Sequence, residues 1–182
     1  TSEGVSFLLK FFCVIIFLMN KITIFTDGSS RGNPGPGGWG AIVVTGKEIR
    51  EIGGREDMTT NNRMELMGAI ESLGSINQAQ SSSHPVTLYS DSQYVIKGMT
   101  EWIEGWQKKG WKNSQKKSVL NRDLWERLLE VSNSKKIEWK YVKGHHENAG
   151  NNRCDEIATS FADGNPVKLY RGSVDSYDTK IV

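Results

Sequence analysis

The sequence predicts an α/β domain built on one mixed five-stranded sheet, with three antiparallel strands followed by two parallel ones and helices on its faces. Two patterns indicate this fold. Three strand-like segments follow one another with short connections, and later strand-like segments alternate with helical ones. A length of 182 residues with 37% hydrophobic content fits one globular domain. We expect that domain over residues 19–164, after an apolar extension at 1–18 and before a polar tail at 165–182.

The first three strands form a predicted antiparallel meander. Residues 21–27 (KITIFTD) carry apolar side chains on both faces, which is typical of a central, covered strand. Residues 39–45 (WGAIVVT) and 48–53 follow, joined by a turn at Gly46. The glycines and prolines between positions 32 and 40 fit a hairpin turn, and a backbone without side chains also permits close approach to a phosphodiester.

The remaining chain alternates helices and strands. Thr60 or Asn61 is expected to cap a helix, because apolar residues recur after them at helical spacing from Leu66 to Ile76. Residues 78–85 (QAQSSSHP) read as a solvated loop. The later predicted elements are a strand at 86–90, a helix through 94–96, a helix at 123–131, a strand at 137–142 and a last helix from about 153 to 162.

The amino terminus differs from the rest of the chain. Residues 5–19 (VSFLLKFFCVIIFLM) are apolar apart from Lys10 and Ser6, but they fall short of the ~20 residues needed to span a bilayer. They also have no basic leader and no small-residue cleavage site, which disfavours a secretory signal. We expect translation to start at Met19, and the alternative is a membrane-associating segment.

Charge and cysteine content narrow the classes of function. The net charge of +2 is the balance of 23 basic and 21 acidic residues, so attraction to nucleic acid must come from local clustering of charge. The two cysteines form no CxxC pair, which disfavours a thiolate zinc site or a disulfide scaffold. We expect a cytoplasmic protein without membrane association.

Four acidic residues stand where a carboxylate is costly to bury: at strand ends or beside the packed stripe of a helix. Each could be a helix cap or an ion-paired surface acid, with Arg63 and Arg153 as local partners. Two carboxylates ~4 Å apart repel by about 4 kcal/mol at an effective dielectric of ~20, so a cluster would need cations. Oxygen ligands without cysteine favour Mg²⁺ or Mn²⁺. The four acids are Asp27, Glu65, Asp91 and Asp155.

Five ordered segments carry a family resemblance that covers the chain from Met19 to about Pro166. They are TDGSSRGNPGPGGWGAIV at 26–43, TTNNRMELMGAI at 59–70, SDSQYVIKGM at 90–99, a stretch rich in Trp and Lys at 102–125, and VKGHHENAGNNRCDEIA at 142–158. Together they resemble ribonuclease H of the bacterial type 1 class. The resemblance implies the ribonuclease H-like fold and an endonuclease that cuts the RNA strand of an RNA/DNA hybrid.

The resemblance also implies roles for single residues. The four acids would hold Mg²⁺, with Mn²⁺ as a substitute and two ions present with substrate, leaving 5′-phosphate and 3′-hydroxyl ends. His145 would move protons or assist product release. The family's usual loop separates two histidines by a glycine-containing linker, whereas His145 and His146 are adjacent here. The ten-residue spacing to Asp155 favours His145, with His146 or a solvated loop histidine as alternatives.

Substrate contacts are implied at two places. Asn33, Asn61 and Gln93 match positions that contact the hybrid in its minor groove, and amides suit a 2′-hydroxyl because both groups donate and accept. For Asn61 and Asn62 the alternative is helix capping, which one of them is expected to provide as well.

A basic arm at residues 102–122 supplies the second set of contacts. From position 107 to 122 it contains six basic residues and no acid, which favours binding to phosphates. The interleaved tryptophans could instead pack in the core. In the family the matching segment is a protrusion that grips the DNA strand, so we expect a monomer that binds hybrid by itself. The expected binding residues here are Trp102, Trp106, Lys108, Lys109, Lys112 and Asn121.

Three other classes of protein share parts of this pattern. A hybrid-binding module without catalysis would keep the arm and lose one or more acids, whereas all four are present. A nuclease or integrase domain that cuts duplex DNA, or that belongs to a polymerase, is less expected because the arm is intact and the sequence contains no polymerase segment. A membrane-associated protein would use residues 5–19.

Overall fold

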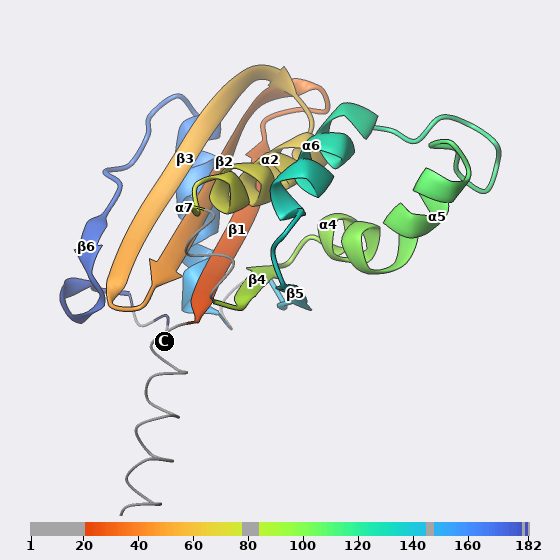
Figure 1. Ribbon diagram of the computed structural model, residues 1–182. Helices are drawn as coiled ribbons and strands as arrows, with labels where there is room; N and C mark the ends of the chain where they lie inside the picture. Colours follow the sequence, from red (N-terminus) through yellow and green to blue (C-terminus); the bar gives the residue numbers. More distant parts are fainter. Residues whose placement is uncertain (1–20, 78–83, 145–147, 180, 182) are drawn as a thin grey trace, which may run out of the picture.

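The computed structural model describes residues 21–77, 84–144, 148–179 and 181, and it contains one mixed sheet (Figure 1). The sheet has six strands in the order β5-β4-β1-β2-β3-β6, so the prediction of five was one strand short. The α/β class and the mixed character of the sheet are confirmed. The strands are β1 (Ile22–Ser30), β2 (Gly35–Thr45), β3 (Glu48–Thr59), β4 (Val86–Ser90), β5 (Ile137–Tyr141) and β6 (Arg171–Ser173).

The strand directions agree with the expected meander. Strands β1, β2 and β3 pair antiparallel, and β4 and β5 add parallel beside β1. The hairpin is longer than predicted, because the glycines from Gly35 to Gly40 belong to strand β2 and not to the turn. A Cβ at Gly38 would lie 2.3 Å from the carbonyl oxygen of Ala158, and one at Gly40 would lie 2.5 Å from that of Cys154. These glycines therefore let a helix pack directly on the sheet.

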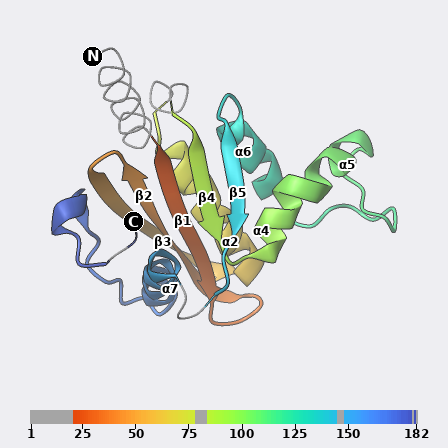
Figure 2. The same cartoon turned by 90° about the horizontal axis from the view of Figure 1, so that it is seen from below.

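Helices cover both faces of the sheet. Helices α2 (Asn61–Gly74) and α6 (Arg122–Ser132) lie on one face and α7 (Ala149–Ala162) on the other (Figures 1 and 2). The larger core lies under α2 and α6 and includes Leu66, Ile70, Leu88 and Trp125, whereas Phe25, Ile42 and Cys154 belong to the second core.

The basic arm extends away from the sheet (Figure 1). It follows α4 (Gln93–Lys97), begins at the end of a π-helical turn (Gly98–Trp102) and continues through α5 (Ile103–Lys108). A Cβ at Gly98 would lie 2.0 Å from the ring of Trp125, so this glycine leaves room for the fully buried indole at the base of the arm. The arm is thereby attached to the larger core.

The helix caps correct two expectations. Thr60 caps α2, since its side chain accepts a hydrogen bond from the backbone N–H of Arg63 at 3.4 Å, so the added expectation that Asn61 or Asn62 caps the helix is wrong. Helix α7 begins at Ala149, four residues before the expected start, with Asn148 as its cap. Asn148 Oδ1 accepts from the backbone N–H of Asn151 at 3.0 Å.

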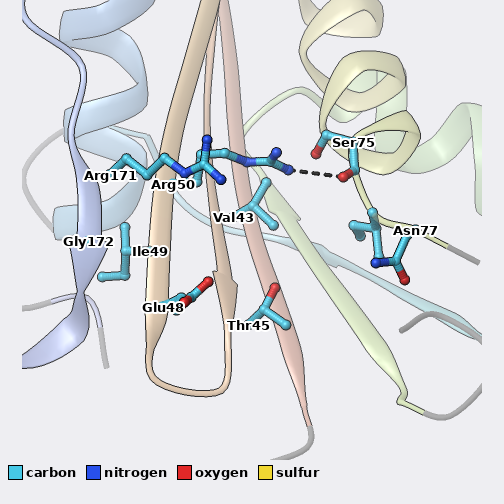
Figure 3. A pocket seen from close by; sticks show the side chains of 10 residues that line it. Val43, Thr45, Glu48, Ile49, Arg50, Ser75, Asn77, Arg171 and Gly172 are labelled. Atoms are coloured by element: carbon cyan, nitrogen blue, oxygen red, sulfur yellow. Dashed lines mark hydrogen bonds between the residues drawn. The ribbon is translucent and has the colours of Figure 1, made fainter. Parts of the chain in front are cut away.

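Within the segment 165–182, predicted as a polar tail, lie β6 and a short 3₁₀ turn (Val174–Ser176). Tyr170 and Tyr177 pack against each other with tilted rings whose centroids are 4.9 Å apart, and both contact the second core. Strand β6, β3 and the end of α2 enclose a pocket of about 400 Å³, where Arg50 Nη2 donates to the carbonyl oxygen of Ser75 at 3.0 Å (Figure 3).

The apolar extension at 1–18 lies outside the described residues. Among the residues that are described, no helix combines the length and the apolar character needed to cross a membrane.

Candidate metal centre

Three of the four predicted acids converge at one end of the sheet. Asp27 lies on β1, Asp91 directly follows β4, and Glu65 is on α2; one carboxylate oxygen of each lies within 4.8 Å of the others. Gly28 makes this approach possible, because a Cβ there would lie 2.2 Å from the backbone nitrogen of Glu65. The first turn of α2 is thus pressed against β1 beside Asp27.

Burial makes this group of acids electrostatically unusual. Asp27 and Glu65 are each only 6% exposed. Burial, reinforced by the charges of Asp91 and Asp155, raises the pKa of Asp27 to about 8, and the hydrogen bond that Gly28 N–H donates at 2.7 Å opposes this rise. Burial, with the charges of Asp27 and Asp91, also holds the pKa of Glu65 well above its usual range. Both carboxyl groups would ionise more readily beside added positive charge.

The arginines expected as local partners are engaged elsewhere. Arg63 forms an ion pair with Asp123 at 2.7 Å, and Arg153 forms one with Glu51 at 2.8 Å. Among the described residues, Glu65 Oε2 is buried with no hydrogen-bond partner. A cluster of hard oxygen donors with an unsatisfied lone pair fits Mg²⁺ or Mn²⁺, which compensate the repulsion between the carboxylates. The residues present therefore suit a divalent cation.

Asp155 stands apart from the three-acid group. It is half-buried on α7, and Thr159 Oγ1 donates to its Oδ1 at 3.4 Å. Its carboxylate is not among the oxygens that lie within 4.8 Å of one another, yet its charge contributes to the raised pKa of Asp27. The geometry thus brings three acids together and leaves the fourth beside them.

One residue of this centre was missed by the sequence reasoning. Asn151 is 2% exposed, and its Nδ2 donates to Asp91 Oδ2 at 3.1 Å, while its own Oδ1 has no partner among the described residues. A signal was present, because Asn151 lies four residues before Asp155 and so shares its side of a helix. A Cβ at Gly144 would lie 2.5 Å from the same Asp91 oxygen, so the chain also passes closely there.

Comparison with known proteins decides the family. A sequence model of the RNase H family matches residues 19–163. The chain belongs to the RNase H family. Relatives named ribonuclease H include those of Syntrophotalea carbinolica, 54% identical over 80% of this chain and 93% of that protein, and of a Cyanothece species, 53% identical over 80% and 92%. LC9-RNase H1, described as a type 1 RNase H with the type 2 active-site motif, has a TM-score of 0.72 and 29% identity, covering 83% of this chain and 77% of that one.

One of the amides expected to contact substrate in this RNase H touches the acid cluster. Asn61 Nδ2 donates to Glu65 Oε1 at 3.3 Å, which places it in contact with the acid cluster. Asn33, Asn62 and Gln93 are exposed. Asn121 adopts a left-handed backbone with φ of 57° before α6, where Arg63 Nη1 donates to its Oδ1 at 3.4 Å and its Nδ2 donates to the Tyr94 hydroxyl at 3.3 Å.

On the arm of this RNase H, the tryptophans pack on aromatic neighbours and the lysines face solvent. Trp102 and Trp106 have ring centroids 5.6 Å apart, and Trp106 also packs against the larger core, as the alternative of core packing predicted. Lys108, Lys109 and Lys112 are exposed. A shallow pocket of about 450 Å³ is lined by residues that include both tryptophans, Lys109 and Lys112. His145 and His146 lie outside the described residues.

Proposed function

We propose that this RNase H is an endonuclease that hydrolyses the RNA strand of RNA/DNA hybrids with Mg²⁺, or Mn²⁺ in its place, held by Asp27, Glu65 and Asp91 together with Asp155. The convergence of the first three acids supports this most, since their oxygens lie within 4.8 Å and two of them are buried. Such a group is unfavourable without cations. The family assignment supports the reaction class.

Two hydrogen bonds orient the acids of this site before any cation binds. Gly28 N–H fixes Oδ1 of Asp27, and Asn151 fixes Oδ2 of Asp91, so one oxygen of each acid is oriented. Asp27 and Glu65 lose their protons when cations bind, because positive charge offsets the cost of burial. When bound, two divalent cations supply the positive charge that favours attack by water and departure of the 3′ oxygen, leaving a 5′-phosphate and a 3′-hydroxyl. His145, which lies outside the described residues, is the proposed proton-transfer residue.

Selection of a hybrid rests on contacts with both strands. Asn33, Asn61 and Gln93 would contact the minor groove and its ribose hydroxyls, and Asn61 is already placed beside Glu65. The exposed lysines and the tryptophans of the arm would grip the DNA strand. Requiring both sets of contacts would disfavour duplex DNA on one side and duplex RNA on the other.

The assay compares cleavage of three labelled duplexes: RNA/DNA hybrid, duplex RNA and duplex DNA, each with Mg²⁺ or with chelator. We expect only the hybrid to be cut, with the cuts internal to the RNA strand, and chelator to stop cleavage. Asp27→Asn should lose more than about 100-fold in rate, because it removes a proposed metal ligand. Asp57→Asn is the matched control, since Asp57 is exposed and pairs only with Arg55 among the described residues.

Two results would contradict the proposal. Cleavage of the hybrid at an unchanged rate in chelator, or by Asp27→Asn, would exclude the metal mechanism. Equal cleavage of duplex DNA would favour the integrase-like alternative over a hybrid-specific enzyme. Binding of hybrid without any cleavage would identify a catalytically silent module.

A further inference from the structure

A third buried carboxylate, that of Glu51 on β3, lies outside the acid cluster. The side chain of Glu51 is 0% exposed, and its negative charge is balanced by an ion pair with Arg153. Arg153 donates to both oxygens, from Nε at 2.8 Å and from Nη2 at 2.9 Å. The Tyr177 hydroxyl donates at 2.6 Å and the Tyr170 backbone N–H at 2.8 Å. Burial alone would raise the pKa of Glu51, but these hydrogen bonds outweigh it and the pKa is lowered, so the carboxylate is charged at neutral pH.

Arg153 joins three parts of the chain, one of which is β3 with the Glu51 carboxylate. Besides Glu51 on β3, its guanidinium donates from Nη1 to Glu156 Oε2 on α7 at 2.7 Å and from Nη2 to the carbonyl oxygen of Lys168 at 3.1 Å. The bidentate contact with Glu51 fixes the orientation of the planar Arg153 guanidinium as well as its distance. It therefore sets the rotation of α7 relative to the sheet. The bond to Lys168 attaches the segment that carries Tyr170 and Tyr177.

The same turns of α7 carry Asn151, which reaches the acid cluster, and Asp155, which lies beside it. Asn151 and Asp155 are four residues apart and lie on one side of the helix, and Arg153 lies between them, about 200° around the axis. Asn151 donates to Asp91 Oδ2 at 3.1 Å, and Asp155 lies one turn further along the same side of α7. Any rotation of α7 that loosened Arg153 from Glu51 would displace both residues from the cluster.

We propose that the Glu51–Arg153 pair is a positioning device for catalysis: it fixes the first turns of α7 so that Asn151 and Asp155 meet the metal-binding acids, and the carboxyl-terminal segment at 168–177 completes it. This inference rests on the proposed metal site. The segment beyond the expected domain end at residue 164 is therefore part of the catalytic unit through Tyr170 and Tyr177.

The test measures the Mg²⁺ concentration at half-maximal activity, kcat and KM for hybrid in Glu51→Gln and in Tyr177→Phe. Glu51→Gln keeps the size of the side chain and removes its charge, and Tyr177→Phe removes one hydrogen bond. For Glu51→Gln we expect the Mg²⁺ midpoint to rise and kcat to fall, each by about tenfold or more, with little change in KM, because neither residue touches the substrate-binding amides. Tyr177→Phe should shift both quantities in the same direction by less.

Asp163→Asn is the matched control. Asp163 forms an ion pair with Arg31 just after the other end of α7, so its loss weakens an attachment of the same helix far from Asn151. We expect this variant to lower the melting temperature without moving the Mg²⁺ midpoint. A folded Glu51→Gln with wild-type midpoint and kcat would overturn the proposal, and if that variant does not fold, wild-type values in Tyr177→Phe would do so. Wild-type activity that needs no metal would instead refute the proposed function itself.

Discussion

Asn151 donates a hydrogen bond from its side-chain nitrogen to Oδ2 of Asp91 at 3.1 Å, which links the first turn of α7 to the end of β4. The crossover from β4 to β5 separates the two residues along the chain, and Asn151 is 2% exposed. The amide fixes Oδ2 of Asp91 and leaves Oδ1 available to a cation. The bond thus orients one of the three converging acids.

Replacing Asn151 with alanine should lower kcat by roughly 10- to 100-fold, the usual cost of losing a residue that orients a metal ligand. KM for hybrid should change little, because Asn151 is buried and does not face the expected substrate contacts. Steady-state kinetics at saturating Mg²⁺ measures both. The control is Asn165→Ala, an exposed asparagine beyond the end of α7. Equal kcat in the two variants would show that orientation of Asp91 is unimportant.

Asp27→Asn should stabilise the metal-free protein while it abolishes activity. Because the pKa of Asp27 is raised to about 8, the folded protein keeps a proton that the unfolded chain releases near pH 4. This contribution to the free energy of unfolding is complete below pH 4 and is lost as pH rises towards 8. Denaturation in chelator at pH 5 to 8 measures the free energy of unfolding of both proteins. The difference in favour of Asp27→Asn over wild type should grow by up to about 1.4 kcal/mol per pH unit. Asp57→Asn, which changes an exposed acid, should show no such growth.

Neutralising Lys109 and Lys112 together should weaken hybrid binding and flatten its dependence on salt. Both lysines are exposed and line the pocket beside Trp102 and Trp106. Each lost phosphate contact should reduce the slope of log affinity against log salt by about 1. Binding titrations of the double glutamine variant at several salt concentrations measure this slope. Lys47→Gln, in the β2–β3 turn, should keep the wild-type slope, and an unchanged slope in the double variant would exclude these contacts.

Gly28→Ala and Gly105→Ala should have opposite effects. A Cβ at position 28 would lie 2.2 Å from the backbone of Glu65, so α2 must move away from β1 and the acid cluster opens. We expect a loss of about 3 kcal/mol in the free energy of unfolding, together with loss of activity. A Cβ at position 105 meets nothing within 4 Å inside α5, so alanine should stabilise by about 0.5–1 kcal/mol. Denaturant unfolding compares the two, and a neutral Gly28→Ala would contradict this account of the close approach.

Much of the fold and of the acid site could be predicted from local pattern. Strand β1 follows from apolar residues on both faces, and α2 from the helical spacing that begins at Leu66. The position of Asp91 directly after β4 follows from the same patterns, because strand periodicity extends over only a few residues and is visible in the chain itself. The expectation that Asp27 ends its strand is wrong, since β1 continues to Ser30. The ordered motifs added the expectation that the acids form one site.

The sequence by itself determined the places of β1, β4, β5 and α2 and which acids stand beside buried surface, since these depend on neighbours along the chain. Only the tertiary structure decided what meets across the fold. It assigned Gly35 to Gly40 to a strand, because α7 needs a bare backbone there. It also brought Asn151 to Asp91 and closed Tyr177 over Glu51, pairs separated by 60 and 126 residues. Local spacing can place Asn151 on the same helix side as Asp155, but it does not name the partner in either contact, because a buried polar pair is stabilised by the geometry of two distant elements and by the exclusion of water between them.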